Sequence, residues 1–477
     1  MSEKETEKIE TLIEERGSVR NDYVNLKSLT RKVDFRIIPL LFITYSLQFM
    51  DKLALSSSSV FGVREDNHLV GQDYSWVSSI FYFGYLAGQF PVTRMVQIVP
   101  IGKFIGATVT LWGVVLACSA SSESYVGLLV ARFFLGLLES AVSPVFVIVT
   151  SMWYRVEQQP ARTAIWFGGN DFGGIVSGFI AFGLGHIRGS LNPWRYIFII
   201  YGAMTVFWGI ILMMFLPDCP EKASFLTLQE KEYYSENHKN SQITREWKWD
   251  QFFECFLDIK TWLLVALCIL NILPNGGVIS YGFIIIESFG FSSINTTLLN
   301  VPASLVTWLS ILFTGYVSSR FKSMRLWMII FTVIPPIAGA AIISKVPLHR
   351  KGVKLFGYYL LMIQPATFPN ILALISSNYQ GTTKKATMSA IIFIFYCASN
   401  VAAPQLFILS EAPNYSVAYN AWISTFAITV LIALIMRFYL QWENGRRGKM
   451  EEKNEASDID KNNDISDLND KSFIYQY

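Results

Sequence analysis

Charged residues are scarce in this chain of 477 residues. Asp, Glu, Lys and Arg make up 16% of it and hydrophobic residues 52%, whereas a soluble protein would carry about 25% charged residues. The deficit is concentrated in apolar blocks of about 20 residues, each long enough to cross the ~30 Å hydrocarbon core of a bilayer as a helix. The composition therefore predicts a multi-pass membrane protein that has the lipid bilayer as its surroundings.

The chain also lacks the motifs of enzymes and of nucleic-acid-binding proteins. Its five cysteines show neither metal-ligand spacing nor a CxxC pair. We find no nucleotide-binding loop, HExxH helix or nucleophile elbow, and no basic run interleaved with aromatic residues. We therefore expect no enzyme activity, no metal, no nucleic-acid partner and no cofactor beyond a proton gradient.

Twelve apolar blocks, divided six and six by a polar stretch, predict an all-α membrane protein of two six-helix bundles. The blocks are 34–58, 74–96, 102–122, 125–152, 162–187, 194–216, 261–287, 297–319, 325–345, 353–378, 385–410 and 417–440. The predicted parts are a cytosolic N-terminal tail at 1–33, an N-terminal bundle at 34–216, a cytosolic linker at 217–260, a C-terminal bundle at 261–442 and a disordered cytosolic tail at 443–477. Because residues 1–33 are polar and charged, we expect no secretory signal peptide before the first block.

The distribution of Lys and Arg sets the predicted orientation. Both tails are rich in these residues and share one side of the membrane, because the number of spans is even. Basic residues favour the cytosolic side, so both termini are predicted to be cytosolic. The sequons at Asn295 and Asn414 then fall in external loops.

Five ionisable residues lie inside the apolar blocks, all in the first half of the chain. A charge at bilayer depth costs ~3 kcal/mol on insertion scales, so such residues usually face a cavity and have a function. We find no acidic or basic residue in the interiors of the second-half blocks. The chemistry is therefore predicted in the N-terminal bundle, at Asp51, Lys52, Arg132, Glu139 and Asp171.

Arg132 and Glu139 lie seven residues apart and so share one helix face about two turns apart. The separation of ~10 Å along the helix axis is too long for a direct ion pair. The guanidinium of Arg132 can donate two parallel hydrogen bonds to a carboxylate. A glutamate shielded from water favours its neutral form, so Glu139 can carry a proton. The structural alternative is that each residue pairs with another helix for packing alone.

Asp51, Lys52 and Asp171 are less specific candidates. Adjacent residues on a helix point about 100° apart, so either Asp51 or Lys52 can face a cavity while the other faces a neighbouring helix. A local ion pair between them is the alternative. Asp171 lies among glycines that permit close helix approach; it can balance Lys52 or Arg132, or join a proton path.

Proline and glycine interrupt blocks in the second half of the chain. Such interruptions free backbone groups and suit gates and cavity walls. Nearby polar side chains are candidate ligand donors, although each alone is more often an interhelical hydrogen bond. These candidates are Asn271, Asn275, Gln364, Tyr396 and Asn400.

Several strings of the sequence resemble a known family. They are SWVSSIFYFGYLAGQFP at 75–91, ARFFLGLLESAVSPVFVIVTSMWY at 131–154, ESFGFSSINTTLLNVP at 287–302 and TKKATMSAIIFIFYCASNVAAPQ at 383–405. In combination they resemble the major facilitator superfamily, in particular the fungal allantoate permease group of anion:cation symporters. The likeness runs from about Val33 to Trp442.

The resemblance implies proton-driven import of a small organic anion by alternating access, with allantoate, ureidosuccinate, a vitamin carboxylate or a sulfur-containing acid as substrate. It ties the arginine matching Arg132 to carboxylate binding, and the acids matching Glu139 and Asp51 to proton coupling. Two departures stand out. The first span reads MDKLALSSSS at 50–59, where the family usually has leucine-aspartate-arginine followed by an asparagine pair, so Lys52 replaces an arginine. The string SNVAAP at 399–404 replaces the more usual glycine-asparagine-isoleucine-isoleucine-glycine-proline. Asp171 is also unusual at its position.

The predicted function is therefore a monomeric importer in the plasma membrane. An internal membrane such as the endoplasmic reticulum is the alternative location. A proton-coupled exporter and a non-transporting nutrient sensor are the alternative functions.

Overall fold

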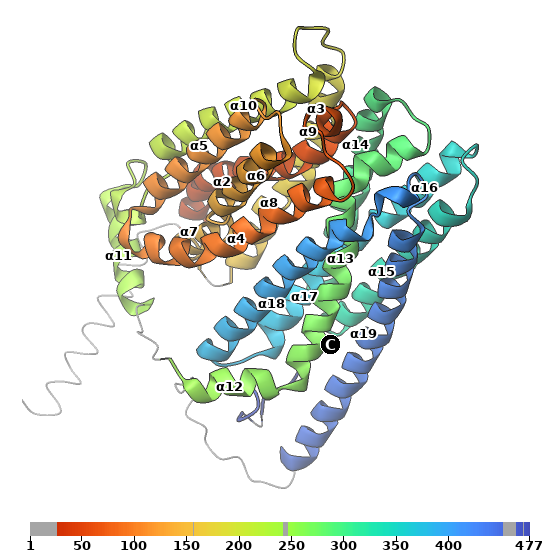
Figure 1. The fold of residues 1–477 in the computed structure, drawn as a ribbon. Coiled ribbons are helices and arrows are strands. Elements are labelled where there is room, and N and C mark those ends of the chain that lie inside the picture. Colours follow the sequence, from red (N-terminus) through yellow and green to blue (C-terminus); the bar gives the residue numbers. More distant parts are fainter. Residues whose placement is uncertain (1–25, 156, 242–246, 452–463, 471) are drawn as a thin grey trace, which may run out of the picture.

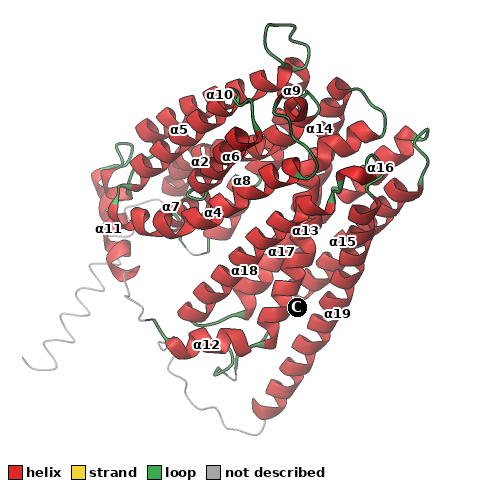
Figure 2. Cartoon of the chain, viewed as in Figure 1, coloured by secondary structure: helices red, strands yellow, loops and turns green. Residues whose placement is uncertain are grey.

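The structure is a computed structural model, and it describes residues 26–155, 157–241, 247–451, 464–470 and 472–477. Within these ranges every regular element is a helix (Figure 2). The N-terminal bundle consists of α2 (Leu26–Ser59), α3 (Val63–Asp66), α4 (Asp73–Ile98), α5 (Ile101–Ser119), α6 (Tyr125–Glu139), α7 (Val142–Trp153), α8 (Gln159–Phe167), α9 (Gly169–Leu184) and α10 (Pro193–Phe215).

The C-terminal bundle lies beside the N-terminal bundle (Figure 1). It consists of α13 (Ile259–Ser288), α14 (Ser293–Arg320), η2 (Lys322–Met324), α15 (Arg325–Lys345), α16 (Lys351–Leu361), η3 (Gln364–Ala366), α17 (Thr367–Asn378), α18 (Thr382–Ala402), η4 (Ala403–Leu406), η5 (Leu409–Glu411) and α19 (Ser416–Glu451). The predicted linker is itself partly helical, with η1 (Pro220–Lys222), α11 (Leu228–Ser241) and α12 (Trp249–Leu257).

The apolar blocks of the sequence coincide with these helices. Among the described residues, ten helical stretches are long and apolar enough to cross a membrane. The helix α4 and the α8–α9 pair occupy the two remaining positions of the predicted twelve. The helix α2 begins at Leu26 and runs unbroken past Asp51 and Lys52 to Ser59, so these charges do not interrupt the first span.

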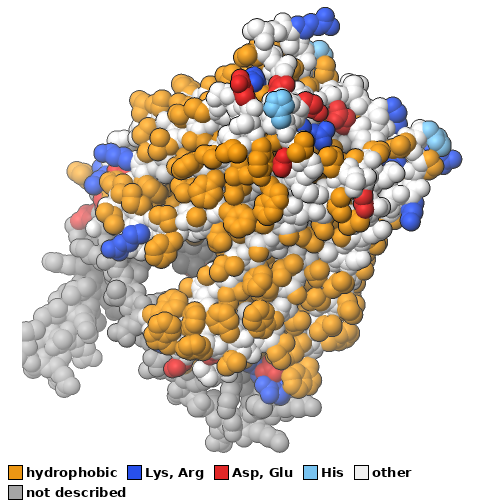
Figure 3. All heavy atoms as spheres, in the orientation of Figure 1, with side chains coloured by type: hydrophobic (Ala, Val, Ile, Leu, Met, Phe, Trp, Pro, Cys, Tyr) orange, Lys and Arg blue, Asp and Glu red, His pale blue; other side chains and the backbone are white. Residues whose placement is uncertain are grey.

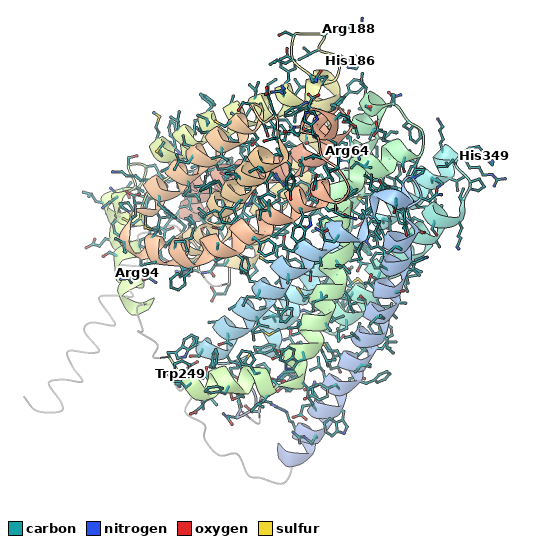
Figure 4. All side chains as sticks on the ribbon, viewed as in Figure 1. Arg64, Arg94, His186, Arg188, Trp249 and His349 are labelled. Carbon is teal, nitrogen blue, oxygen red and sulfur yellow. The ribbon has the colours of Figure 1, made fainter. Side chains whose placement is uncertain are left out.

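The molecule has two polar ends separated by an apolar middle. We call them the tail end, where α2 and α13 begin and α19 finishes, and the far end, where α2 and α13 finish. Hydrophobic side chains cover the middle of the visible face, and charged side chains gather toward the ends (Figure 3). Figure 4 places Arg94 and Trp249 toward the tail end, and Arg64, Arg188 and His349 at the far end. An apolar belt of this kind is the surface that lipid covers.

The C-terminal tail differs from the expectation of disorder. The helix α19 continues to Glu451, and in the described residues beyond it Ser466, Asp467 and Tyr475 are buried. Composition alone missed this packing because it depends on partners far away in the sequence. The tails' residues 1–25, 452–463 and 471 lie outside the described part of the chain.

Asp467 is the centre of this docking. Its carboxylate forms ion pairs with Lys260 at the start of α13 and with Lys384 at the start of α18, the latter at 2.9 Å. Asp258 lies 3.1 Å from the Lys260 amine and 3.0 Å from the Lys384 amine. Arg447 of α19 donates hydrogen bonds to backbone carbonyls of the same segment. The C-terminal segment thus connects α13, α18 and α19 at the tail end of the molecule.

Replacing Asp467 by Asn should release this segment. Burial alone would raise the pKa of the Asp467 carboxyl, but Lys260 and Lys384 outweigh this and hold the pKa below its usual range. The contribution of the carboxylate is therefore complete above the unfolded pKa of ~3.9 and is lost as pH falls through the lower folded value. We expect the hydrogen-exchange protection factors of the described residues in 464–477, which are corrected for the pH dependence of intrinsic exchange, to be large and unchanged between about pH 6 and pH 8 in the native chain.

In Asp467→Asn, hydrogen exchange in this segment should be fast at the same pH. The free energy that holds the segment in place should fall by only about 2 kcal/mol, because both lysines keep other acidic partners. The matched control is Asp470→Asn, whose carboxylate accepts hydrogen bonds from Ser472 within the segment itself. Equal protection in both variants would contradict the role given to Asp467.

Candidate functional site

The helix α6 carries its two charged residues on one buried face. Its buried residues are Leu128, Arg132, Leu135, Gly136 and Glu139, a spacing that follows the 3.6-residue period of a helix. The predicted shared face of Arg132 and Glu139 is therefore present in the structure.

Glycines bring α6 unusually close to α4. A Cβ atom built at Gly136 would lie 1.9 Å from the backbone oxygen of Phe81, and one built at Gly84 would lie 2.0 Å from that of Phe133. Side chains at these two positions would push the helices apart. The close contact fixes the Phe81 ring beside the charged face of α6.

Two cations lie against the Phe81 ring. The Arg132 guanidinium is 5.1 Å from the ring centroid and the Lys52 amine is 5.9 Å from it. The Lys52 amine is also 5.8 Å from the centroid of the Tyr85 ring. Arg132 is 4% exposed, and its Nε atom has no hydrogen-bond partner. Both cations are thus held by aromatic faces, at distances typical of cation–π contacts.

The acids Glu139 and Asp51 lie nearby but are directed differently. Glu139 is buried, and its Oε2 atom makes no hydrogen bond. The Asp51 carboxylate accepts a 3.4 Å hydrogen bond from Thr205 of α10. Asp51 therefore faces a neighbouring helix, while Lys52 lines the central cavity. The sequence analysis predicted that one of these two residues would face a cavity and the other a neighbouring helix.

Among the described residues, no ion pair within 4.0 Å joins Asp51, Lys52, Arg132, Glu139 or Asp171 to any partner. The recorded ion pairs lie elsewhere, mostly toward the tail end. Ionic packing pairs and a local Asp51–Lys52 bridge are therefore absent from the described residues, although Arg132 packs on Phe81 of α4 and Asp51 accepts a hydrogen bond from Thr205 of α10. Buried charges without ionic partners are costly, so these five residues stay candidates for the functional site.

A cavity of about 690 Å³ lies between the two bundles. Its lining includes Lys52 and Asp171 from the N-terminal bundle and extends to Thr163, Ser376 and Lys385 near the tail end. Figure 3 shows the surface hollowed between the bundles on that side. The cavity therefore runs from the unpaired charges toward the tail end.

Asp171 stands in the first turn of α9, which continues from α8 through Gly168 in helical conformation. It is 5% exposed. The surrounding glycines allow the expected close approach: a Cβ at Gly173 would lie 2.2 Å from the backbone oxygen of Ser46 on α2, and one at Gly174 would lie 2.6 Å from Ser304 Oγ on α14. This packing brings Asp171 to the cavity wall.

The C-terminal candidates divide into two groups. Asn275, Gln364, Tyr396 and Asn400 line the cavity. Asn271 is buried outside the described lining; its backbone oxygen accepts a 2.7 Å hydrogen bond from Gln364 Nε2, and its side-chain amide has no partner. Arg132, Glu139 and Asp51 also lie behind the described lining rather than on it.

Sequence reasoning missed several polar residues of the cavity. They lie on spans that the sequence identified, but a single hydroxyl or amide in an apolar block carries little signal, and only the tertiary arrangement shows which face it occupies. These residues include Tyr45, Gln48, Tyr85, Ser143, Asn170 and Asn300. Lys385, near the tail end, is a further polar residue of the lining.

Hydrogen bonds between the bundles close the far end. The Tyr74 hydroxyl of α4 donates to the Ser280 backbone oxygen of α13 at 2.8 Å, and Ser75 is 2.7 Å from the Tyr281 hydroxyl. Ser75 and Ser79 of α4 also donate to the backbone oxygens of Pro404 and Val401, respectively. We call these interactions the far-end contacts. The cavity is thus closed at the far end and extends toward the tail end.

Comparisons with known proteins identify the family. The sequence profile of the Major Facilitator Superfamily matches residues 41–404, and the chain belongs to this family. The allantoate permease of Saccharomyces cerevisiae is 34% identical over 461 residues, covering 93% of this chain and 84% of the permease.

Two further relatives support the same grouping. The thiamine pathway transporter THI73 of the same yeast is 33% identical over 452 residues, covering 94% of this chain and 86% of that protein. The uncharacterized transporter C757.13 of Schizosaccharomyces pombe is 34% identical, covering 92% and 85% of the two chains. The predicted resemblance to the fungal allantoate permease group is confirmed, and the chain is a multi-pass membrane transporter.

Solved structures confirm the fold. The D-xylose-proton symporter superposes with a TM-score of 0.64 at 13% identity, covering 84% of this chain and 97% of that one. A bacterial homologue of the lysosomal transporter Spinster, inward-facing and unoccupied, gives 0.63 at 15% identity, covering 84% and 95%. The predicted twelve-helix major facilitator fold is therefore correct.

Substituting Gly136 by Val should destabilise the protein by pushing the backbones of α4 and α6 apart. The new side chain must displace α4 at Phe81, and overpacking of this kind costs about 3 kcal/mol at its upper end. We expect a clearly lower melting temperature of the detergent-solubilised protein. Gly183→Val on α9 is the matched control, because a Cβ there meets no atom within 4 Å. Equal melting temperatures of the two variants would disprove the close α4–α6 contact.

Proposed function

We propose that this protein imports a small organic anion together with protons, and that the anion is drawn to the unpaired cations Lys52 and Arg132. The observation that carries the proposal is that neither cation has an ionic partner among the residues that the structure describes, although Arg132 is almost fully buried. A planar guanidinium matches a carboxylate through two parallel hydrogen bonds. An anionic substrate would supply the missing partner.

The buried acids supply a route for coupling to protons. With Glu139 ionised, its negative charge opposes that of an incoming anion; with Glu139 protonated, Lys52 and Arg132 remain as positive charge. Binding of the proton and of the anion therefore favour each other, which is a reciprocal linkage. Asp51 is the second candidate for this role, and Asp171, on the cavity wall, is a third.

Alternating access then completes the cycle. When the far end is open, protons and the anion enter; when the far-end contacts form, the cavity opens at the tail end and both leave. Rocking of one bundle against the other is the motion that such paired bundles perform. Lys/Arg bias supports the assignment of the tail end to the cytosol, and we place the protein in the plasma membrane.

The candidate substrates are small carboxylates whose remaining part is polar. Asn275, Gln364 and Asn400 supply amide groups to the cavity, and these can bond to amide or hydroxyl groups of a ligand. Allantoate, named by the relative in Saccharomyces cerevisiae, is the first probe.

Uptake of labelled allantoate into vesicles with an imposed proton gradient tests the proposal. The native chain should accumulate allantoate, and a protonophore should abolish the accumulation. An exporter in the same orientation would instead deplete the vesicles, and a sensor would move nothing. Gradient-independent uptake would contradict proton coupling.

Glu139→Gln should lose accumulation but keep exchange of labelled for unlabelled allantoate, because the amide cannot carry the proton while the cations stay in place. The matched control is Glu123→Gln, an exposed position before α6, which should accumulate like the native chain. Accumulation that survives in Glu139→Gln would remove this residue from the coupling.

A further inference from the structure

A second, much smaller pocket lies between the Phe81 ring and the far end. Its volume is about 10 Å³, about one water-sized probe. Both bundles contribute to its wall, which is formed by Lys52, Leu55 and Ser56 of α2, Ser78, Phe81 and Tyr82 of α4, Arg132 of α6, and Ile279 and Ser280 of α13. Lys52 also lines the main cavity, so it stands between the two spaces.

The pocket wall is rich in hydrogen-bond donors that have no partner. Ser78 Oγ and Arg132 Nε are buried and make no hydrogen bond to the part of the chain that the structure describes, and Ser56 Oγ, which lies near the Tyr74 hydroxyl, has none there within 3.5 Å. Lys52 adds a second positive charge, and the described wall contains no Asp or Glu. Unsatisfied buried donors beside positive charge are costly unless a ligand satisfies them. Among small ligands, an oxyanion such as a carboxylate accepts hydrogen bonds on both oxygens.

One of the far-end contacts involves a residue of the pocket wall, Ser280. The Ser280 backbone oxygen accepts the hydrogen bond of Tyr74, and Ser75 and Ser79, which flank Ser78 on α4, hold the C-terminal bundle. Separation of α4 from α13 at the far end would therefore open the pocket. With the contacts formed, its volume is too small for a carboxylate, which exceeds a water molecule in size.

We propose that Ser56 and Ser78, together with Arg132 and Lys52, form the subsite for the carboxylate of the transported anion when the far end is open, and that formation of the far-end contacts expels the anion past Lys52 into the main cavity. The inference rests on the proposed function and adds two specificity-determining hydroxyls to it. It also explains why serine can stand in this part of α2: a hydroxyl donates to an oxyanion from a short side chain.

Transport kinetics test whether the hydroxyls of Ser56 and Ser78 bind the substrate. Ser56→Ala and Ser78→Ala should each raise the KM for allantoate about tenfold, the effect of losing one hydrogen bond to a charged group, with the maximal rate kept. Ser58→Ala is the matched control: its Oγ is equally buried and without a partner, but Ser58 is not among the pocket residues. An unchanged KM in both Ser56→Ala and Ser78→Ala would overturn the proposal.

A second measurement needs no substrate. Purified Ser78→Cys is treated with methanethiosulfonate reagents that carry either a sulfonate or a trimethylammonium group, and labelling is followed by mass spectrometry on the peptide containing residue 78. The sulfonate reagent should react about tenfold faster than the cationic one, because a positive cleft concentrates anions. Adding Arg132→Ala should remove the preference.

The two measurements separate the failure of this inference from the failure of the proposed function. If the native chain does not transport allantoate but the sulfonate preference is present, the pocket is an anion subsite and the choice of substrate is wrong. If allantoate is transported but neither reagent is preferred, or if residue 78 never reacts, the subsite is refuted while import stands.

Discussion

The arrangement of this transporter depends on two buried cations held over one aromatic ring. Lys52 and Arg132 lie within about 6 Å of the Phe81 centroid, a range typical of cation–π contacts. The ring occupies this position because glycines let α4 and α6 touch through their backbones. Aromatic faces soften the cost of burying positive charge without neutralising it, so the charge remains available to an anion. The close packing of α4 and α6 therefore also fixes the position of the two cations.

The second organising feature is the difference between the two ends of the molecule. At the far end, hydroxyl-to-backbone hydrogen bonds hold α4 against α13, the end of α18 and η4. These neutral bonds each contribute modestly, about 1 kcal/mol, which suits contacts that form and break in every transport cycle. The tail end of the C-terminal bundle is instead fixed by the buried ion pairs of Lys260, Lys384 and Asp467. Breaking such pairs is expensive, so this bundle is built to move as a unit.

Much of this was predictable from the sequence, for physical reasons. The apolar blocks predicted the helices, because a membrane-spanning helix must be long and hydrophobic. The seven-residue spacing of Arg132 and Glu139 predicted that they share one helix face. The divergence of Asp51 and Lys52 follows from helix geometry. The docked segment around Asp467 was not predictable, because its stability comes from lysines more than 80 residues away. The sequence did not identify Ser56 and Ser78 as candidate site residues, because only the folded structure shows which buried hydroxyls lack a hydrogen-bond partner.

The most direct test of the central claim is the affinity of the purified protein for allantoate when Arg132 is changed to Ala. Loss of one partner from a buried charge pair costs about 2–5 kcal/mol, so affinity should fall by about 30-fold or more. Arg437→Ala is the comparison, because that guanidinium packs on the rings of Trp327 and Tyr477 near the tail end, and it should bind like the native chain. Native affinity in Arg132→Ala would contradict the account.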